Sequence, residues 1–556
     1  MTTAPAETVG GNRLTIGRTI AALVLALLSL TAWALASPVG SSPDDDFHIA
    51  NIYCLHDSSK CRSDDVAWPE GYIGWSLDVR DRDLSAYGSV KDTYPDLWQY
   101  PYPRELPCYI RNGGVWVSDD ATQPADCLDA EDPADNSPAS LDSLGYYPSL
   151  NYRLLSLFTQ DTIRESVVAW RLVTILLIIT LAAVSLALSQ RAWRRPLAVS
   201  WLVASMPVGM FLFASHNPSA LAVAATAASV GPGVALLREP WRPREQIPRV
   251  AFLLICALLT VGGRNEGLGY AAMAAIVIVI LGMRGMSRGP AMAIGGLIVG
   301  ATLLVLITGL WRQPLSQLMD LIDPNSLSGA WDALAQAGKF LSGSYYTALG
   351  WLEIVMPHSV TVPAAAAFWG VVAVGVGAMS RRKAAAIVGT VIILIAFPLA
   401  VEATTGRGIQ ARYYLPLTFL LVIAAVSPVA GKHLSPSRFQ WWGLAASLII
   451  ANTIALLWVT VRYVRGIGAG TMSPPGLAEA GVPQWWWDLW LSPFWNWIVG
   501  SLAYLGLVVV LLPLLNRAPN PVNQGEDEGQ GPAPESDPTE LAGSSPLDAA
   551  SHDPAR

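Results

Sequence analysis

One cluster of side chains in this chain is suited to proton transfer. Asp44, Asp45 and Asp46 are consecutive and lie directly after the first apolar run, and His48 follows them. Neighbouring carboxylates raise one another's pKa, so one of the three could act as a base near neutral pH. If the acids open a helix, Asp44 and His48 lie one turn apart on one face. Three structural alternatives stay open, because the acids could instead cap a helix, hold a divalent cation or form a solvated patch.

A second group of candidate residues precedes a later apolar run. It contains Glu402, Arg407, Gln410, Arg412 and Tyr413. The planar guanidinium group suits phosphate, and a lipid phosphate is available at this depth. We therefore expect Arg412, with Arg407 and Tyr413, to bind a lipid phosphate. The alternative is a salt bridge from an arginine to Glu402, with the tyrosine in the membrane interface.

Two further turns carry polar residues between apolar runs. Arg264 and Glu266 lie between runs 250–262 and 267–283, which either cross the membrane twice or re-enter it. Charged residues at such depth usually pair or line a cavity, so Arg264 is a second candidate for the phosphate. A simple Arg264–Glu266 turn is the alternative. The other cavity candidates are His216 and Asn217, in a tight turn that could be structural only, and Tyr147.

The composition is that of a membrane protein. The chain has 556 residues, of which 52% are hydrophobic and 14% charged, whereas a soluble protein carries roughly a quarter charged residues. No basic domain is present, so nucleic acid is not an expected partner. Membrane-length apolar runs predict about twelve transmembrane helices. The runs are 19–36, 167–188, 197–214, 219–237, 250–262, 267–283, 290–310, 363–379, 384–401, 413–430, 441–461 and 496–515.

Arginine clusters predict the orientation of these helices. They fall at every second connection, which the positive-inside rule assigns to the cytoplasm. Both termini are then cytoplasmic, in a bacterial inner (plasma) membrane, and the long acidic loop is outside. The first run ends in Ala34-Leu35-Ala36, which is also typical of a signal-peptidase site. We expect a retained helix, because the acidic cluster gains from being tethered at the membrane.

These patterns predict an all-α polytopic protein with an ordered sequence of segments. The segments are a disordered cytoplasmic N-terminus (1–13), a first transmembrane helix (14–37), an extracytoplasmic loop or cap with the acidic cluster (38–165), transmembrane helices 2–7 (166–310), an extracytoplasmic segment (311–362), transmembrane helices 8–12 (363–515) with an outer loop (462–495), and a disordered acidic cytoplasmic tail (516–556).

Four of the five cysteines lie in the predicted outer loop. Cys54, Cys61, Cys108 and Cys127 predict two disulfides, of which 54–61 with 108–127 is the most local of three pairings. Unpaired thiols are the alternative. No spacing indicates a metal site, and no cofactor follows from the sequence, although the acidic cluster leaves a divalent cation open.

Four short elements resemble a family of bacterial membrane proteins called domain of unknown function 2142. Residues 42–48 resemble its P-D-E-x-x-H element, 147–152 its P-x-L-x-Y element, 217–219 its N-P-S turn and 410–416 its G/Q-x-R-Y-x-x-P element. They occur in order over residues 15–515. Asp45 stands where the family often has Glu, and Asp46 where it often has Pro.

The resemblance implies a relation to the GT-C superfamily of membrane glycosyltransferases. Such proteins carry an acidic residue in the first outer loop and use polyprenyl-phosphate sugars. The resemblance therefore implies inverting transfer to an envelope glycan acceptor on the outer face. Asp44 or Asp45 would be the base with His48 beside it, and Arg412 and Arg264 would bind the phosphate.

Two other functions stay open. A transporter or flippase of an envelope glycolipid is one, although no internal repeat is visible. A non-catalytic envelope scaffold is the other. The catalytic interpretation requires the acidic cluster and Arg412 to share one site.

Overall fold

The computed structural model describes the helical part of the chain. The described residues are 9–42, 45–56, 147–160, 163–283, 288–307, 349–350, 354–405, 410–429, 436–465, 487 and 489–516. All of them belong to one compact unit, Met1–Arg517.

Helices make up the regular structure within these ranges, which confirms the predicted all-α class. The described residues contain no β-strand; they hold only single bridge positions, at Leu349 with Ile354 and at Val429. Each predicted apolar run contains at least one helix. The helices are α1 (Val9–Leu35), α2 (Asp45–His56), α5 (Leu150–Ser156), α6 (Ile163–Leu188), α7 (Arg191–Ala204), α8 (Val208–Phe213), α9 (Pro218–Arg238), α10 (Pro243–Val261), α11 (Gly267–Gly282), α12 (Arg288–Ile307), α15 (His358–Val376), α16 (Arg381–Thr405), η8 (Ala411–Tyr413), α17 (Leu415–Val426), α18 (Arg438–Arg465) and α19 (Pro493–Asn516).

Six of the described helices are long and apolar enough to cross a bilayer, namely α1, α6, α9, α15, α18 and α19. Helices α11 and α17 are apolar but shorter. These helices confirm the prediction of a membrane protein with several apolar helices. The number of twelve crossings stays a prediction.

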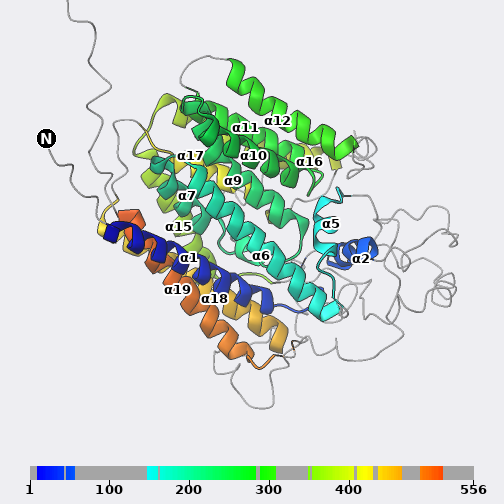
Figure 1. Ribbon diagram of the computed structural model, residues 1–556. Coiled ribbons are helices and arrows are strands. Elements are labelled where there is room, and N and C mark those ends of the chain that lie inside the picture. Colours follow the sequence, from blue (N-terminus) through cyan, green and yellow to red (C-terminus); the bar gives the residue numbers. More distant parts are fainter. Residues whose placement is uncertain are drawn as a thin grey trace, which may run out of the picture. The chain divides into compact units, whose positions relative to one another are not determined.

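Helix α9 is the buried centre of the unit. Its side chains from Pro218 to Ala235 are all buried, and α6, α10 and α11 pack around it, as Figure 1 shows. Many of its residues are Ala, Ser or Gly, which let neighbouring helices approach closely. Asn217 caps the helix, since its Oδ1 accepts the Ser219 N–H at 2.9 Å, and Pro218 occupies the first turn.

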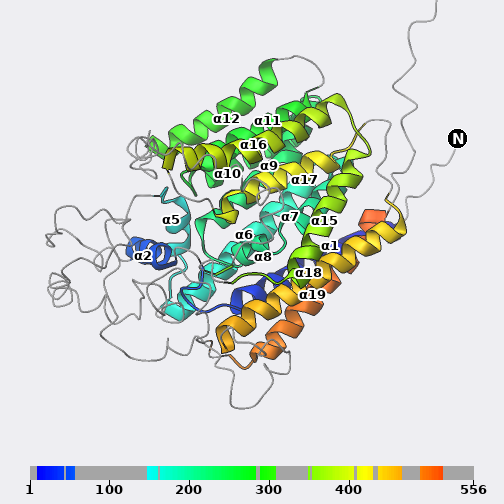
Figure 2. The same cartoon turned by 180° about the vertical axis from the view of Figure 1, so that it is seen from behind.

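The first helix packs against the last one and is hydrogen-bonded to the helix before it. Figures 1 and 2 show α1 beside α19, which packs in turn against α18. Trp33 Nε1 donates to Asn452 Oδ1 at 2.9 Å, and Asn496 Nδ2 donates to the Ala32 carbonyl at 2.9 Å. Helix α1 begins at Val9, earlier than the start at residue 14 that the sequence predicts. These bonds fix the C-terminal end of α1, from which the acidic cluster follows.

The apolar run 197–214 is not one helix, contrary to the sequence pattern. It is divided into α7 and α8, with Ser205 as the C-cap of α7 and Pro207 as the N-cap of α8. Pro207 has no N–H to donate to the preceding turn, which weakens the helix at this point. Helix α8 then ends just before His216.

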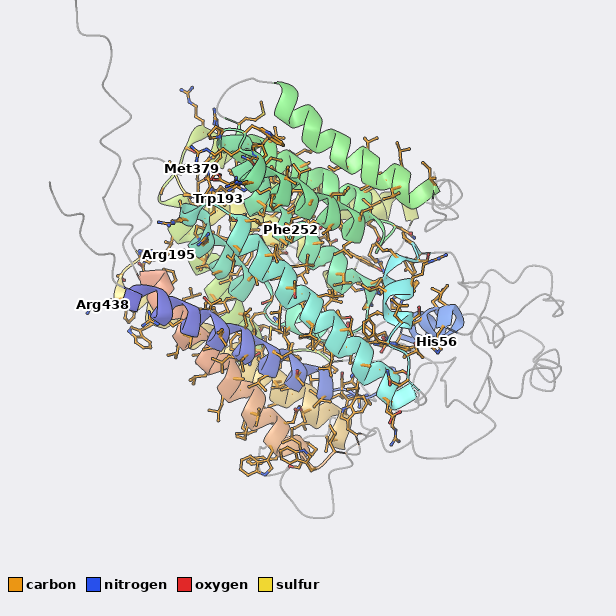
Figure 3. All side chains as sticks on the ribbon, in the orientation of Figure 1. His56, Trp193, Arg195, Phe252, Met379 and Arg438 are labelled. Carbon is orange, nitrogen blue, oxygen red and sulfur yellow. The ribbon has the colours of Figure 1, made fainter. Side chains whose placement is uncertain are left out.

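Arginines mark one end of the helical unit, and the candidate site region lies at the other. Figure 3 places Arg195 and Arg438, which belong to the predicted cytoplasmic clusters, at one end and His56 at the other. Helices α2 and α5 lie together at the His56 end. The candidate site must therefore be sought at the end opposite these arginines.

Candidate functional site

A buried arginine of α6 fixes the connection between α1 and α2. Arg171 Nη1 donates to the carbonyls of Ala34 at 2.6 Å and Ser37 at 2.7 Å, and Nη2 donates to the carbonyl of Pro38 at 2.8 Å and to Ser41 Oγ at 3.2 Å. Carbonyls at the end of a helix lack helical partners, and a cation is favourable there. Arg171 therefore sets the course of the chain as it enters α2.

Asp45 opens α2 and is held from two directions. Ser42 N–H donates to Asp45 Oδ2 at 2.9 Å, and Asp45 N–H donates to the Ser42 carbonyl at 3.1 Å. An acid at the first turn of a helix is favoured by the helix dipole. The other carboxylate oxygen, Oδ1, lies 3.1 Å from Nε2 of His216, and both side chains are fully buried. The imidazole next to Asp45 is thus that of His216.

His48 contacts the two tyrosines of α5 and its N-terminal flank. Its Nδ1 lies 2.8 Å from Tyr152 Oη, and its ring lies 5.8 Å from the ring of Tyr147 and from that of Tyr152. Burial holds the pKa of His48 well below its ordinary value of 6.5, and the positive charges of Arg264 and Arg412 lower it further. His48 is therefore neutral near pH 7, and it lies within electrostatic range of both guanidinium groups.

Arg264 is enclosed by aromatic rings at the turn between α10 and α11. Its guanidinium carbon lies 4.5 Å from the centroid of Tyr147 and 5.1 Å from that of Tyr413. Glu266 accepts from Nε at 3.2 Å and from Nη2 at 3.4 Å. No described residue hydrogen-bonds to the buried Nη1. The predicted Arg264–Glu266 pair is present, and one donor of the arginine faces no described acceptor.

Glycines make this turn tight enough to present Arg264. A Cβ at Gly262 would stand 2.7 Å from the Leu258 carbonyl oxygen and 2.7 Å from Leu150 Cδ2 of α5. A Cβ at Gly267 would overlap the carbonyl oxygen of Thr260. Glycine is required at such close approaches of backbone and side chain. The turn is therefore pressed against α5, which carries the tyrosine partner of His48.

Arg412 lies in η8, at the start of the segment that leads into α17. The side chain is buried, its guanidinium lies 5.2 Å from the Tyr413 ring centroid, and its Nη2 lies 3.4 Å from Tyr413 Oη. Tyr270 Oη of α11 donates to the Tyr413 carbonyl at 3.1 Å. Tyr413 thus joins both arginines.

These contacts unite residues from five separate segments of the chain. His216 contacts Asp45 on one side, and Tyr147 and Tyr413 connect His48 through Arg264 to Arg412. We call this group the buried polar cluster. Its members are Asp45, His48, Tyr147, Tyr152, His216, Arg264, Tyr413 and Arg412.

Two of the other predicted site residues have described contacts, and four do not have described side chains. Asn217 caps α9 beside His216, and the Gln410 carbonyl accepts the Tyr413 N–H at 3.1 Å. Asp46 lies in α2 and Glu402 in α16, but their side chains are outside the described residues, as are Asp44 and Arg407.

The predicted disulfides cannot be placed either. Cys54 lies in α2 without a described side chain, and Cys61, Cys108 and Cys127 lie outside the described residues. Their pairing therefore stays a prediction. The described part of the chain holds no group of three or more His, Cys, Asp or Glu side chains suited to a metal, and a cation involving Asp44 remains untested.

Two residues of the site region were not predicted from the sequence. Arg171 is a charged residue inside the apolar run 167–188, and an intramembrane arginine is by itself a signal of a structural or functional contact. Tyr270 lies in the run 267–283, where nothing in the pattern separates it from a core residue.

Comparison with known proteins places this arrangement in a family. A family model described as "Predicted membrane protein (DUF2142)" matches residues 27–421, a range that contains the whole buried polar cluster. No curated protein and no solved structure matches the chain. Because the family model covers well over half of the sequence, the chain belongs to this family of predicted membrane proteins.

Proposed function

We propose that the protein is an inverting membrane glycosyltransferase. It moves a sugar from a polyprenyl-phosphate donor to a glycan acceptor of the cell envelope, on the outer face of a bacterial inner membrane, with both termini in the cytoplasm. The observation that carries this proposal is the burial, in one cluster, of a carboxylate–imidazole pair together with two guanidinium groups.

The guanidinium end of the cluster supports binding of a phosphate. Arg264 and Arg412 share the ring of Tyr413, and the buried Nη1 of Arg264 has no acceptor among the described residues. A buried donor of this kind costs about 1–3 kcal/mol when left unsatisfied. A phosphate oxygen supplies acceptors for both groups, and charge-assisted bonds to phosphate are the strong ones.

The carboxylate end supports activation of an acceptor hydroxyl. The Ser42 N–H hydrogen-bonds to one oxygen of Asp45 and His216 contacts the other, so both oxygens of the carboxylate have a neighbour in the cluster. In the reaction, a base removes the proton of the hydroxyl while its oxygen attacks the anomeric carbon of the donor sugar. The bond from that carbon to the phosphate oxygen breaks, and both electrons leave with the lipid phosphate.

Positive charge must then meet the charge that develops on the leaving group. Arg412 and Arg264 are suited to this because they are already ordered by Tyr147, Tyr413 and Glu266 before any ligand binds. Preorganised charges of this kind stabilise a transition state without reorganisation at the moment of reaction.

The test uses purified protein in lipid nanodiscs without sugar detergents. The donor probe is a synthetic farnesyl-phosphate-linked sugar, and the acceptor probe is an octyl glycoside. We expect Asp45→Asn to abolish formation of the glycosidic bond and Arg412→Gln to weaken binding of farnesyl phosphate. Glu245→Gln and Arg195→Gln, in the predicted cytoplasmic connections, are the matched controls and keep wild-type rates.

Two results would contradict the proposal. If Asp45→Asn transfers sugar at the wild-type rate, the cluster has no catalytic role. Movement of the lipid-linked sugar across the bilayer without any new bond would instead identify a transporter.

A further inference from the structure

One imidazole in the buried polar cluster lies directly against a carboxylate. His216 Nε2 lies 3.1 Å from Asp45 Oδ1, and both side chains are fully buried. A carboxylate oxygen and an unprotonated ring nitrogen would repel each other at this distance, because both are acceptors. The contact therefore favours a proton on Nε2, and in the tautomer that carries it there the lone pair is on Nδ1.

Neighbouring elements hold this ring in place. The ring centroid of His216 lies 5.7 Å from that of Trp170 in α6, in an edge-to-face arrangement. Asn151 Nδ2 of α5 donates to the His216 carbonyl at 3.4 Å. In the next residue, the Asn217 N–H donates to Ser215 Oγ at 3.3 Å, and Asn217 caps α9. The backbone and the ring of His216 are thus fixed from three sides.

The second nitrogen of the ring faces no described partner. Both ring nitrogens of His216 are buried and neither makes a hydrogen bond within the described ranges, but Nε2 has the Asp45 carboxylate 3.1 Å away, whereas Nδ1 has no described charged partner. A carboxylate on one ring nitrogen and an open second nitrogen form the arrangement in which histidine takes a proton from a nucleophile. The acid then selects the tautomer and orients the ring.

We propose that His216 Nδ1 accepts the proton of the acceptor hydroxyl and that Asp45 orients its ring. This role rests on the proposed glycosyl transfer. The acceptor O–H bond breaks as its proton moves to Nδ1, the oxygen bonds to the anomeric carbon, and the phosphate leaves with the electron pair. The imidazolium then releases the proton to water. His216 is preferred to His48 because a carboxylate faces its ring, whereas the contact of His48 Nδ1 at 2.8 Å is with a tyrosine hydroxyl, Tyr152 Oη.

The first test reads the tautomer without any assay of activity. Nitrogen NMR of protein labelled with ¹⁵N-histidine reports which ring nitrogen carries the proton, and the signal missing from His216→Gln assigns the residue. We expect Nε2–H and bare Nδ1 in the wild type, and a loss of this preference in Asp45→Asn. A proton on Nδ1 in the wild type would overturn the proposal.

The second test is chemical rescue of the transfer reaction with the same farnesyl-phosphate and octyl-glycoside probes. His216→Ala lowers kcat about a hundredfold or more, and added imidazole restores part of the rate because it fills the place of the missing base. His56→Ala is the matched control, since this exposed residue lies at the far end of α2, and imidazole leaves its rate unchanged.

The outcomes separate this role from the function itself. If Asp45→Asn and His216→Ala both lose transfer but imidazole restores nothing to a folded His216→Ala, the glycosyltransferase stands and the role of Nδ1 falls. If the wild type transfers no sugar, the function fails and takes this role with it.

Discussion

Tyr147 lies under the guanidinium group of Arg264, with 4.5 Å between the ring centroid and the guanidinium carbon. The contact joins the residues just before α5 to the turn between α10 and α11. It is therefore one means by which α5 and the guanidinium end of the cluster keep a fixed distance.

The aromatic face of Tyr147, rather than its hydroxyl, is expected to hold Arg264. A buried cation–π contact contributes about 2 kcal/mol. Tyr147→Phe should keep the affinity for farnesyl phosphate, whereas Tyr147→Leu should weaken it roughly tenfold or more. Isothermal titration of the two variants in nanodiscs measures this difference. Equal weakening in both variants would assign the effect to the hydroxyl.

The glycines of α11 provide a matched pair for the close packing of the turn. A Cβ at Gly267 would overlap the Thr260 carbonyl, whereas a Cβ at Gly269 meets nothing within 4 Å. We expect Gly267→Ala to lower the melting temperature and to disturb phosphate binding, because the turn must open. Gly269→Ala should leave both unchanged or raise stability slightly, since Ala favours helix by about 1 kcal/mol. The reverse order would show that the turn does not depend on this contact.

Arg171 should contribute more to stability than any surface arginine. Arg171→Leu leaves the carbonyls of Ala34, Ser37 and Pro38 without their donor, and a buried hydrogen bond to a charged group is worth about 1.5–3 kcal/mol. We expect a fall of several degrees in the melting temperature, partly recovered by Arg171→Lys, since an ammonium reaches fewer of these carbonyls. Arg242→Leu, at an exposed ion pair, should change little. A stable Arg171→Leu protein would mean that these bonds are replaceable.

The depressed pKa of His48 makes stability depend on pH in one direction. In the unfolded chain this ring takes up a proton near pH 6.5, but in the folded protein it does so only at lower pH. Between these two values the unfolded state binds more protons, so stability falls as the pH falls. The melting temperature should therefore fall more steeply below pH 6.5 for the wild type than for His48→Gln. Parallel curves would show that His48 titrates alike in both states.

Most of the helices could be predicted because a membrane-length apolar run must form a helix to satisfy its backbone hydrogen bonds in lipid. Two details could not. Pro207 divides the run 197–214, although proline occurs inside other helices of this chain such as α9. Helix α10 begins at Pro243, before its apolar run, because a polar first turn carries no signal of membrane length.

The sequence predicts most residues of the buried polar cluster, but it does not predict which of them contact one another. The phase of α2 decides which acid faces which imidazole, and a start one residue earlier rotates every side chain by about 100°. The helix begins at Asp45, and its partner His216 comes from a turn that the sequence also allows to be purely structural. Long-range contacts of this kind depend on how α6, α9 and α5 pack, which no local pattern contains.

The docking of Arg171 onto the end of α1 bears on how the chain is processed. Ala34-Leu35-Ala36 is typical of a peptidase site, yet Ala36 is fully buried and the Ala34 carbonyl is bound to Arg171. A protease needs this segment extended and accessible. The arginine that shields it is synthesised 137 residues after Ala34. The folded protein therefore keeps this segment out of reach of a protease, and we expect any cleavage to precede the packing of α6 against α1.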